Sequence, residues 1–473
     1  MKKIMTNFIY QSIYQLASII LPIITIPIVS RALGPEGIGT WNYMQSIMNY
    51  FLLLAGLGLA NYGVREIAIV RDNKDKLSIK FWELALFNFF FSIITLTAYL
   101  IVSMCLKNTN LYLIQSLVLI GALFDITWFY SGTEDFKKIS FTGVLIKFIG
   151  FIFTFLFIKN QNDLPKYVFI QSISILLNQL VLWLFMINKV KIKKISIKKI
   201  FSHFFPALRF FISKIAMTIY LNLNKTILGY MTTMTVVGYY SNALTLVTLS
   251  GSLITSLNTV LIPTMSNTYI SGDEQSLIKR LEKSLHFQLF LTIPLSFGIM
   301  LVNEKMINWF FGSEFEFIVK IVPLLAPVVI VQSLQSGIAA QYLIPKNDMK
   351  SYNLTVVIGA VISVICNIVA IPIMGIYGAV LATIAGQTTL CIVRSYTLIK
   401  ETSFRYNMKL IIQYFVCSLL MFVIGGIITK NMISSMMTTF AQIVIGMGIY
   451  FLFTMILKIN PIYNLIISKR KFK

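Results

Sequence analysis

Four cationic side chains fall within, or at the edge of, apolar stretches of this sequence: Lys147 in one stretch, and Arg209, Lys214 and Lys225 in another. Lys214 and Lys225 are eleven residues apart, so at about 100° per residue they share one face of a helix, with Thr218 between them. A cation near the middle of a bilayer costs at least about 2.5 kcal/mol. We therefore expect Lys214 to face water, a partner or an anionic ligand, whereas Lys225 is near enough to a helix end to snorkel.

Asp125 is the one acidic residue well inside an apolar stretch. Counted from the inner ends of their helices, Asp125 and Lys147 lie at similar depth. We predict that these two residues pair, and Asp125 is also the main alternative partner for Lys214.

Polar residues recur at helical spacing in the first two stretches and give each one polar face. The residues are Asn7, Gln11, Gln15, Asn42, Gln45 and Asn49. A stripe of serine and threonine follows between Thr248 and Thr259. Such groups can simply hydrogen-bond neighbouring helices, but stripes in matched helices of two halves favour a shared aqueous cavity.

No set of residues here has the spacing of a catalytic, cofactor or metal site. His203 and His286 stand at helix ends without a partner pattern, and the cysteines fall inside apolar stretches without ligand spacing. There is no phosphate-binding Gly-x-x-x-x-Gly-Lys loop. The basic run 189–199 lacks interleaved aromatic residues, which favours lipid headgroups over nucleic acid. We therefore predict a transporter without a cofactor or metal, not an enzyme.

The elements that hold these residues are helices that cross a membrane. Hydrophobic residues make up 57% of the 473 residues, and a spanning helix needs about 20 mostly apolar residues. We predict an all-α polytopic membrane protein of about fourteen spans, at 6–30, 38–60, 81–106, 111–131, 139–159, 165–187, 204–229, 235–266, 283–304, 318–345, 351–372, 374–398, 408–428 and 434–456.

The basic residues set the predicted orientation, because Lys and Arg accumulate in cytoplasmic loops. With the N-terminus inside, 30 basic residues fall in inside loops, Arg394 among them, and seven, including Arg31, fall outside. Both termini are therefore predicted to be cytoplasmic, and the net charge of +23 is mostly a topology signal.

The spans divide into two groups of six. We predict an N-terminal lobe at 1–187, a basic cytoplasmic linker at 188–203, a C-terminal lobe at 204–398, and two further helices with a basic tail at 399–473. The turns after the first and seventh spans each open the next helix with an aromatic residue and then Asn. This short similarity suggests a parallel repeat with a substrate path between the halves.

Several motifs together resemble the Wzx-type polysaccharide flippases of the multidrug/oligosaccharidyl-lipid/polysaccharide superfamily. These motifs are Arg31–Gly39, Tyr62–Ala68 followed by Arg71–Asp72, Asp125–Phe136, Gly238–Ala243, and Asn367–Pro372 followed by Gly375–Ala379. The resemblance implies a V-shaped bundle that works by alternating access. It also implies a substrate, an undecaprenyl-pyrophosphate-linked oligosaccharide, moved from the inner to the outer leaflet of the bacterial cytoplasmic membrane for surface polysaccharide or teichoic acid assembly. A pyrophosphate is an anion, so Arg31, Lys147, Arg209, Lys214 and Lys225 become the predicted cationic lining.

Two positions depart from the family pattern. Relatives carry acidic residues where this chain has Asn224 and Gln387, so Asp125 is left as the candidate for ion coupling. The alternatives are a multidrug antiporter of the same superfamily, which would need acidic residues in its cavity, and a non-transporting scaffold of a cell-wall synthesis complex. We expect a monomer, with a polymerase or glycosyltransferases of the pathway as partners.

Overall fold

The computed structural model describes residues 2–187 and 189–463, with the side chains of 2–5, 8, 212, 213, 253–257 and 259 left aside. Every regular element of this described part is helical. Lipid offers the backbone no hydrogen bonds, so each apolar stretch must satisfy its own N–H and C=O groups within a helix. The predicted all-α membrane fold is confirmed.

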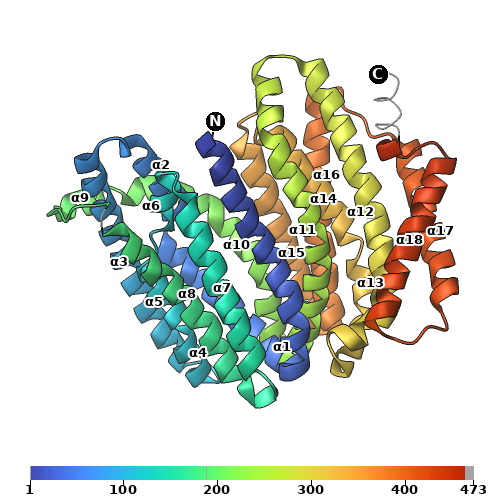
Figure 1. Cartoon of the computed structure of the whole chain (residues 1–473), viewed down its shortest axis with the longest axis horizontal. Helices are drawn as coiled ribbons and strands as arrows, with labels where there is room; N and C mark the ends of the chain where they lie inside the picture. Colours follow the sequence, from blue (N-terminus) through green and yellow to red (C-terminus); the bar gives the residue numbers. More distant parts are fainter. Residues whose placement is uncertain (1, 188, 464–473) are drawn as a thin grey trace. The chain divides into compact units, whose positions relative to one another are not determined.

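The predicted number of fourteen spans is not confirmed. Eleven helices of the described residues are long and apolar enough to cross a membrane, or twelve if Ile197–Phe211 and Lys214–Met231, which meet at 56°, form one bent span. One of the eleven, Ile9–Val70, is 62 residues long and joins the first two predicted stretches. Only Gly34, with φ 66° and ψ 179°, interrupts the helical backbone within α1 (Lys2–Gly56; Figure 1).

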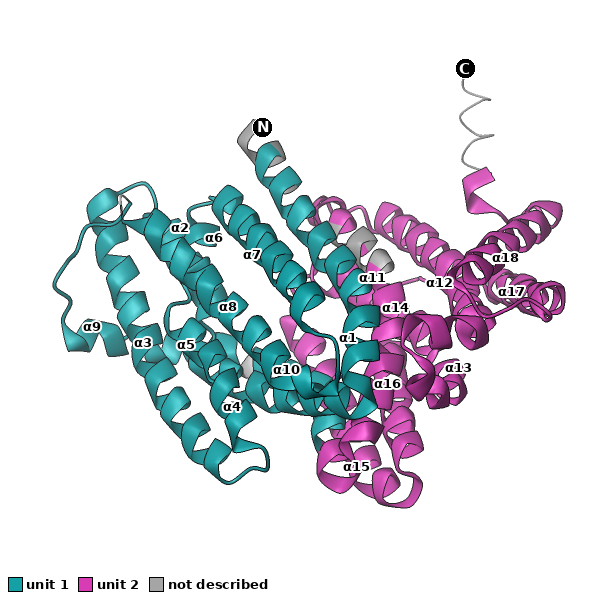
Figure 2. Ribbon diagram, turned by 60° about the horizontal axis from the view of Figure 1, so that its bottom comes forward, with its two compact units in different colours: residues 1–226 teal, residues 227–473 magenta. Residues whose placement is uncertain are grey.

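The chain forms two compact units, 1–226 and 227–473, shown in teal and magenta in Figure 2. The predicted lobes at 1–187 and 204–398 stay a prediction. After α1, the first unit holds α2 (Leu59–Val70), α3 (Lys74–Met104), α4 (Thr109–Gln115), α5 (Leu117–Leu123), α6 (Thr127–Gly132), α7 (Phe136–Phe157), η1 (Gln161–Asp163), α8 (Leu164–Met186), α9 (Ile197–Phe201) and most of α10 (Phe204–Met231). The second unit holds α11 (Met234–Ile270), α12 (Glu274–Phe310), η2 (Ser313–Lys320), α13 (Val322–Leu325), α14 (Val328–Ile338), the π-helix η3 (Ala339–Leu343), α15 (Met349–Met374), α16 (Ile376–Glu401), α17 (Met408–Thr429) and α18 (Met436–Ile456).

An aromatic cluster forms the core of the first unit where α3, α6 and α8 meet. Phe81 is fully buried, and its ring centroid lies 5.0 Å from that of Phe129, 5.7 Å from Trp128 and 5.8 Å from Trp183. The buried Tyr130 donates a hydrogen bond to the carbonyl of Leu182 over 2.6 Å. The motif Asp125–Phe136 therefore builds the packing of this unit, because its aromatic side chains supply the core.

Close contact between α15 and α16 shapes the second unit. A tight turn separates the helices predicted at 351–372 and 374–398, because α15 ends at Met374, α16 begins at Ile376, and Gly375 between them has φ 55°. A methyl group added to Gly378 would lie 2.5 Å from the backbone of Ala370. Small residues at such a crossing let two helix backbones approach, which favours helix association in a membrane.

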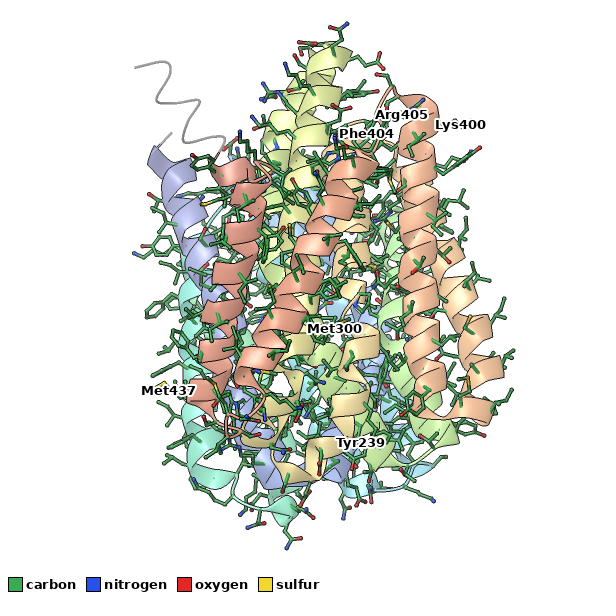
Figure 3. The ribbon with its side chains drawn as sticks, turned by 90° about the vertical axis from the view of Figure 1, so that its right-hand side faces the viewer. Tyr239, Met300, Lys400, Phe404, Arg405 and Met437 are labelled. Atoms are coloured by element: carbon green, nitrogen blue, oxygen red, sulfur yellow. The ribbon has the colours of Figure 1, made fainter. Side chains whose placement is uncertain are left out.

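The helices α12, α17 and α18 pack side by side through buried aromatic residues. Phe290 lies 5.5 Å from Tyr414 and 5.3 Å from Tyr450, between ring centroids. In Figure 3, Lys400 and Arg405 lie at one end of the second unit, and Tyr239 and Met437 lie at the other. The prediction puts Lys400 and Arg405 in an inside loop and Tyr239 and Met437 next to outside loops, so the two pairs are expected at opposite ends.

Candidate functional site

A seam of polar side chains joins α1 to α10 inside the first unit. We call this set of residues the α1–α10 seam, and its members are Asn42, Ser46, Asn49, Asn222, Lys225 and Thr226. The Lys225 ammonium group donates to the side-chain oxygen of Asn42 over 2.9 Å, and the Asn49 amide donates to Asn222 over 2.8 Å. The hydroxyl groups of Ser46 and Thr226 are 2.9 Å apart. Spacings of three and four residues on each helix align these groups on facing sides.

The seam continues into the first unit through amide groups. Gln45 donates to Asn49 over 3.2 Å and accepts from Gln115 over 3.3 Å. Gln115 is fully buried and accepts from the hydroxyl of Tyr99 over 3.0 Å. The predicted polar stripe Asn42, Gln45 and Asn49 is therefore brought together on α1, and its members hydrogen-bond neighbouring helices.

Lys225 is the charged member of the seam. Its side chain is half-buried, and its hydrogen-bond partner is the neutral amide of Asn42. Within the described part of the chain, no carboxylate lies at ion-pair distance from its ammonium group. A partly desolvated cation with a neutral partner favours the approach of an anion, because the anion would supply the missing counter-charge.

Lys147 contributes a second cation, on α7 facing the first half of α1. Its ammonium group donates to the hydroxyl of Ser18 over 2.7 Å and lies 4.4 Å from the ring centroid of Tyr14. Its side chain is exposed. These contacts leave the charge without a carboxylate and accessible.

The predicted pair between Asp125 and Lys147 is wrong. Asp125 instead accepts hydrogen bonds from the backbone N–H of Thr127 (2.9 Å) and from its hydroxyl (2.7 Å). These bonds close a turn of the backbone just before α6, a position where Asp side chains commonly accept from the N–H two residues on. The predicted role of Asp125 in ion coupling stays a prediction.

The remaining predicted residues are spread over the first unit. Arg31, Gln11, Gln15 and Arg209 are exposed. Asn7 donates to the backbone carbonyl of Glu134 over 2.9 Å.

Lys214 is half-buried on α10 and makes no hydrogen bond or ion pair with any residue that the structure describes. It lies eleven residues before Lys225 on the same helix, which is about 16 Å along the axis at 1.5 Å per residue. The seam therefore includes Lys225 and leaves Lys214 outside. Much of the stripe between Thr248 and Thr259 lies outside the described side chains.

Sequence reasoning missed Arg394, which was counted with an inside loop. It lies within α16 and is only 3% exposed. Its guanidinium group donates to the Thr355 hydroxyl over 3.1 Å and to the carbonyl and side-chain oxygens of Gln335, and it stacks 4.9 Å from the ring centroid of Tyr352. The signal that could have found it was its position inside the predicted span 374–398.

The histidines also have partners that the sequence pattern did not indicate. His203 is buried and hydrogen-bonds Tyr62 (2.6 Å) and Glu83 (3.2 Å). His286 contacts the carbonyl of Glu282 (2.7 Å) and accepts from the N–H of Asn407 (3.0 Å). Because Tyr62 and Glu83 are more than a hundred residues from His203 in sequence, no local pattern predicts these contacts.

Comparisons with known proteins place this geometry in a family. The chain is 24% identical over 414 residues to a protein of Escherichia coli K12 named "Putative O-antigen transporter", a match that covers 86% of this chain and 97% of the relative. Its fold is similar to that of the lipid II flippase MurJ in an inward closed conformation, with a TM-score of 0.73 and 21% identity over 95% of this chain and 98% of the other. It is also similar to an inward-facing multidrug resistance MATE family transporter of the MOP superfamily, with a TM-score of 0.63 and 17% identity over 83% and 94% of the two chains.

The family described as "Polysaccharide biosynthesis protein" matches residues 4–269, which is more than half of the chain and includes the whole α1–α10 seam. The protein therefore belongs to this polysaccharide biosynthesis family.

Proposed function

We propose that this protein is a flippase that moves lipid-linked oligosaccharides across a membrane by alternating access. The family match supports this function, as do relatives named as an O-antigen transporter and a lipid II flippase. The substrate that fits best is an oligosaccharide on undecaprenyl pyrophosphate. It would move from the inner to the outer leaflet of the bacterial cytoplasmic membrane, for surface polysaccharide or teichoic acid assembly.

The observation that carries this proposal is the environment of Lys225. Its ammonium group has a neutral amide as its partner and no carboxylate nearby among the described residues. A pyrophosphate group would replace Asn42 as the acceptor and form a charge-assisted hydrogen bond, which is stronger than a neutral one. Lys214, half-buried on the same helix and without a described partner, lies about 16 Å from Lys225 along the axis, too far to contact the same pyrophosphate, so it would meet the substrate at another depth.

The rest of the seam suits the sugars. Ser46, Asn49, Asn222 and Thr226 are hydroxyl and amide groups that pair with one another. A hydrogen bond between helices in a membrane is worth only about 0.6 kcal/mol on average. Such bonds can therefore be exchanged for bonds to sugar hydroxyls at little cost when α1 and α10 separate.

The membrane setting of the proposal follows the charge distribution. Both termini and the linker 188–203 would be cytoplasmic. Separately, we propose a monomer as the working form, with a polymerase or glycosyltransferases of the pathway as partners. Reporter fusions within 188–203 and after Lys473 should both give a cytoplasmic signal. An external signal from either fusion would contradict this orientation.

The direct test is a flipping assay with purified protein in liposomes. A fluorescent oligosaccharide on a polyprenyl pyrophosphate should cross the bilayer faster than in empty liposomes, and the same oligosaccharide on a polyprenyl monophosphate should cross more slowly. Equal rates with and without protein would refute the flippase. Export of an organic cation in place of the lipid would instead support a multidrug antiporter.

A further inference from the structure

A buried cluster of ionisable groups ties the start of α10 to α2 and α3 in the first unit. His203 precedes α10, and its Nδ1 lies 2.6 Å from the Tyr62 hydroxyl of α2. Its Nε2 lies 3.2 Å from a carboxylate oxygen of Glu83 on α3. All three residues are only 4% exposed. The seam lies elsewhere on α10, so the proposed substrate site does not use this cluster.

Two further charged residues complete the cluster. The Lys80 ammonium group lies 3.0 Å from Glu83 and 3.6 Å from Glu66. Arg65, one position before Glu66 on α2, is exposed. With a neutral His203, the charge of the buried Glu83 is balanced by Lys80, and Lys80 and Glu66 are themselves half-buried.

The neutral imidazole satisfies this geometry completely. The Tyr62 hydroxyl donates to Nδ1, and the Nε2–H donates to Glu83, so each ring nitrogen has its partner. A second proton on the ring would make Nδ1 a donor, so the Tyr62 hydroxyl would have to accept and turn its own proton away from the ring. The new positive charge would also be buried against a carboxylate that already serves Lys80. Burial disfavours the charged form of a histidine, so uptake of a proton should weaken the contact.

The linker 188–203, which ends at His203, also forms hydrogen bonds with α3. The N–H of Lys191 donates to the Ser78 hydroxyl over 3.1 Å, and its carbonyl accepts from the Trp82 indole over 3.1 Å. A methyl group at Gly58, where α2 begins, would lie 2.4 Å from the carbonyl of Ala207 on α10. The linker and the first turns of α10 are therefore packed on α2 and α3, with His203 as the titratable contact among them.

We propose that Tyr62, Glu83 and His203 form a proton-binding site in which neutral His203 holds the start of α10 on α2 and α3, and a bound proton releases it. Because α10 also carries Lys214 and Lys225, this site makes transport depend on pH. The pH dependence of transport rests on the proposed flippase function, whereas the proton-binding site does not.

Hydrogen exchange tests the proton site without any substrate. Purified protein in nanodiscs is exchanged at about pH 5.5 and pH 8, on either side of the ordinary range of histidine. After correction for the intrinsic rates, peptides covering 200–211 should exchange faster at the acidic pH than at pH 8. His203→Gln should remove this response, because glutamine can donate to Glu83 and accept from Tyr62 but does not titrate.

The matched control is His286→Gln, which changes the other histidine of the chain and should leave the response at 200–211 unchanged. Tyr62→Phe provides a second test if His203→Gln does not fold. It removes the partner of Nδ1 and should raise exchange at pH 8 toward the acidic value. An unchanged pH response in His203→Gln, or the same loss in His286→Gln, would overturn the proton site.

The flipping assay then separates this proposal from the function on which it rests. Wild-type protein should flip the pyrophosphate-linked substrate with a pH profile that His203→Gln flattens and His286→Gln does not. If wild type and His203→Gln give the same profile, the site does not govern transport. If wild type does not flip at any pH, the proposed function fails, while hydrogen exchange still decides the proton site.

Discussion

Replacing Lys225 with methionine removes the charge of the α1–α10 seam and keeps most of the side chain's volume. A hydrogen bond to a charged group contributes about 1.5–3 kcal/mol. If the substrate's pyrophosphate takes the place of Asn42 on this ammonium group, Lys225→Met should weaken substrate binding by about 10- to 150-fold, at tenfold for each 1.4 kcal/mol.

The folded protein should tolerate the same change. Lys225 is half-buried and its partner is neutral, so its removal relieves a desolvation cost at the same time as it breaks one hydrogen bond. We therefore expect membrane abundance and the thermal unfolding midpoint to stay close to those of wild type. Lys225→Arg keeps the charge and should retain part of the affinity.

The assay is the concentration dependence of flipping by reconstituted protein, measured with a polyprenyl-pyrophosphate oligosaccharide. The matched control is Lys137→Met, because Lys137 is an exposed lysine at the start of α7; this variant should behave as wild type. A well-folded Lys225→Met protein with wild-type half-saturation would refute the reasoning that Lys225 meets the anion.

Three further predictions concern stability. Arg394→Lys should lower the free energy of unfolding by about 2–4 kcal/mol, since a lysine cannot keep the several hydrogen bonds and the stacking of the buried guanidinium; an unchanged melting temperature would contradict this. Gly378→Ala should cost about 1–3 kcal/mol from its clash with backbone, whereas Gly448→Ala, which meets nothing within 4 Å, should be close to neutral. Hydrogen bonds from Ser351 lower the pKa of Asp348. The ionised Asp348 therefore stabilises the folded protein above about pH 4, and this contribution is lost as the pH falls through the lowered pKa. Asp348→Asn should flatten this part of an acid unfolding curve.

The local contacts in the first unit show what could not be foreseen from the sequence. The predicted partner of Asp125 was Lys147, twenty-two positions away, yet its hydrogen-bond partner is Thr127, two positions away. The depth of a residue along its own helix was predictable, but the direction of its side chain toward a neighbour was not. Arg394 and His203 likewise gain their partners only where separate helices meet.

The sequence alone determined that the chain is helical and membrane-embedded, and roughly where α8 and α15 to α18 begin and end. The physical reason is local: without water, an apolar segment must pair its own backbone groups, and turns such as that at Gly375 depend on a few adjacent residues. The tertiary structure decided which polar residues meet, because Asn42 and Lys225 are 183 positions apart and their contact depends on how α10 packs against α1. The charge of Lys225 was visible in the sequence, but the neutral partner that leaves it open to an anion was decided by packing.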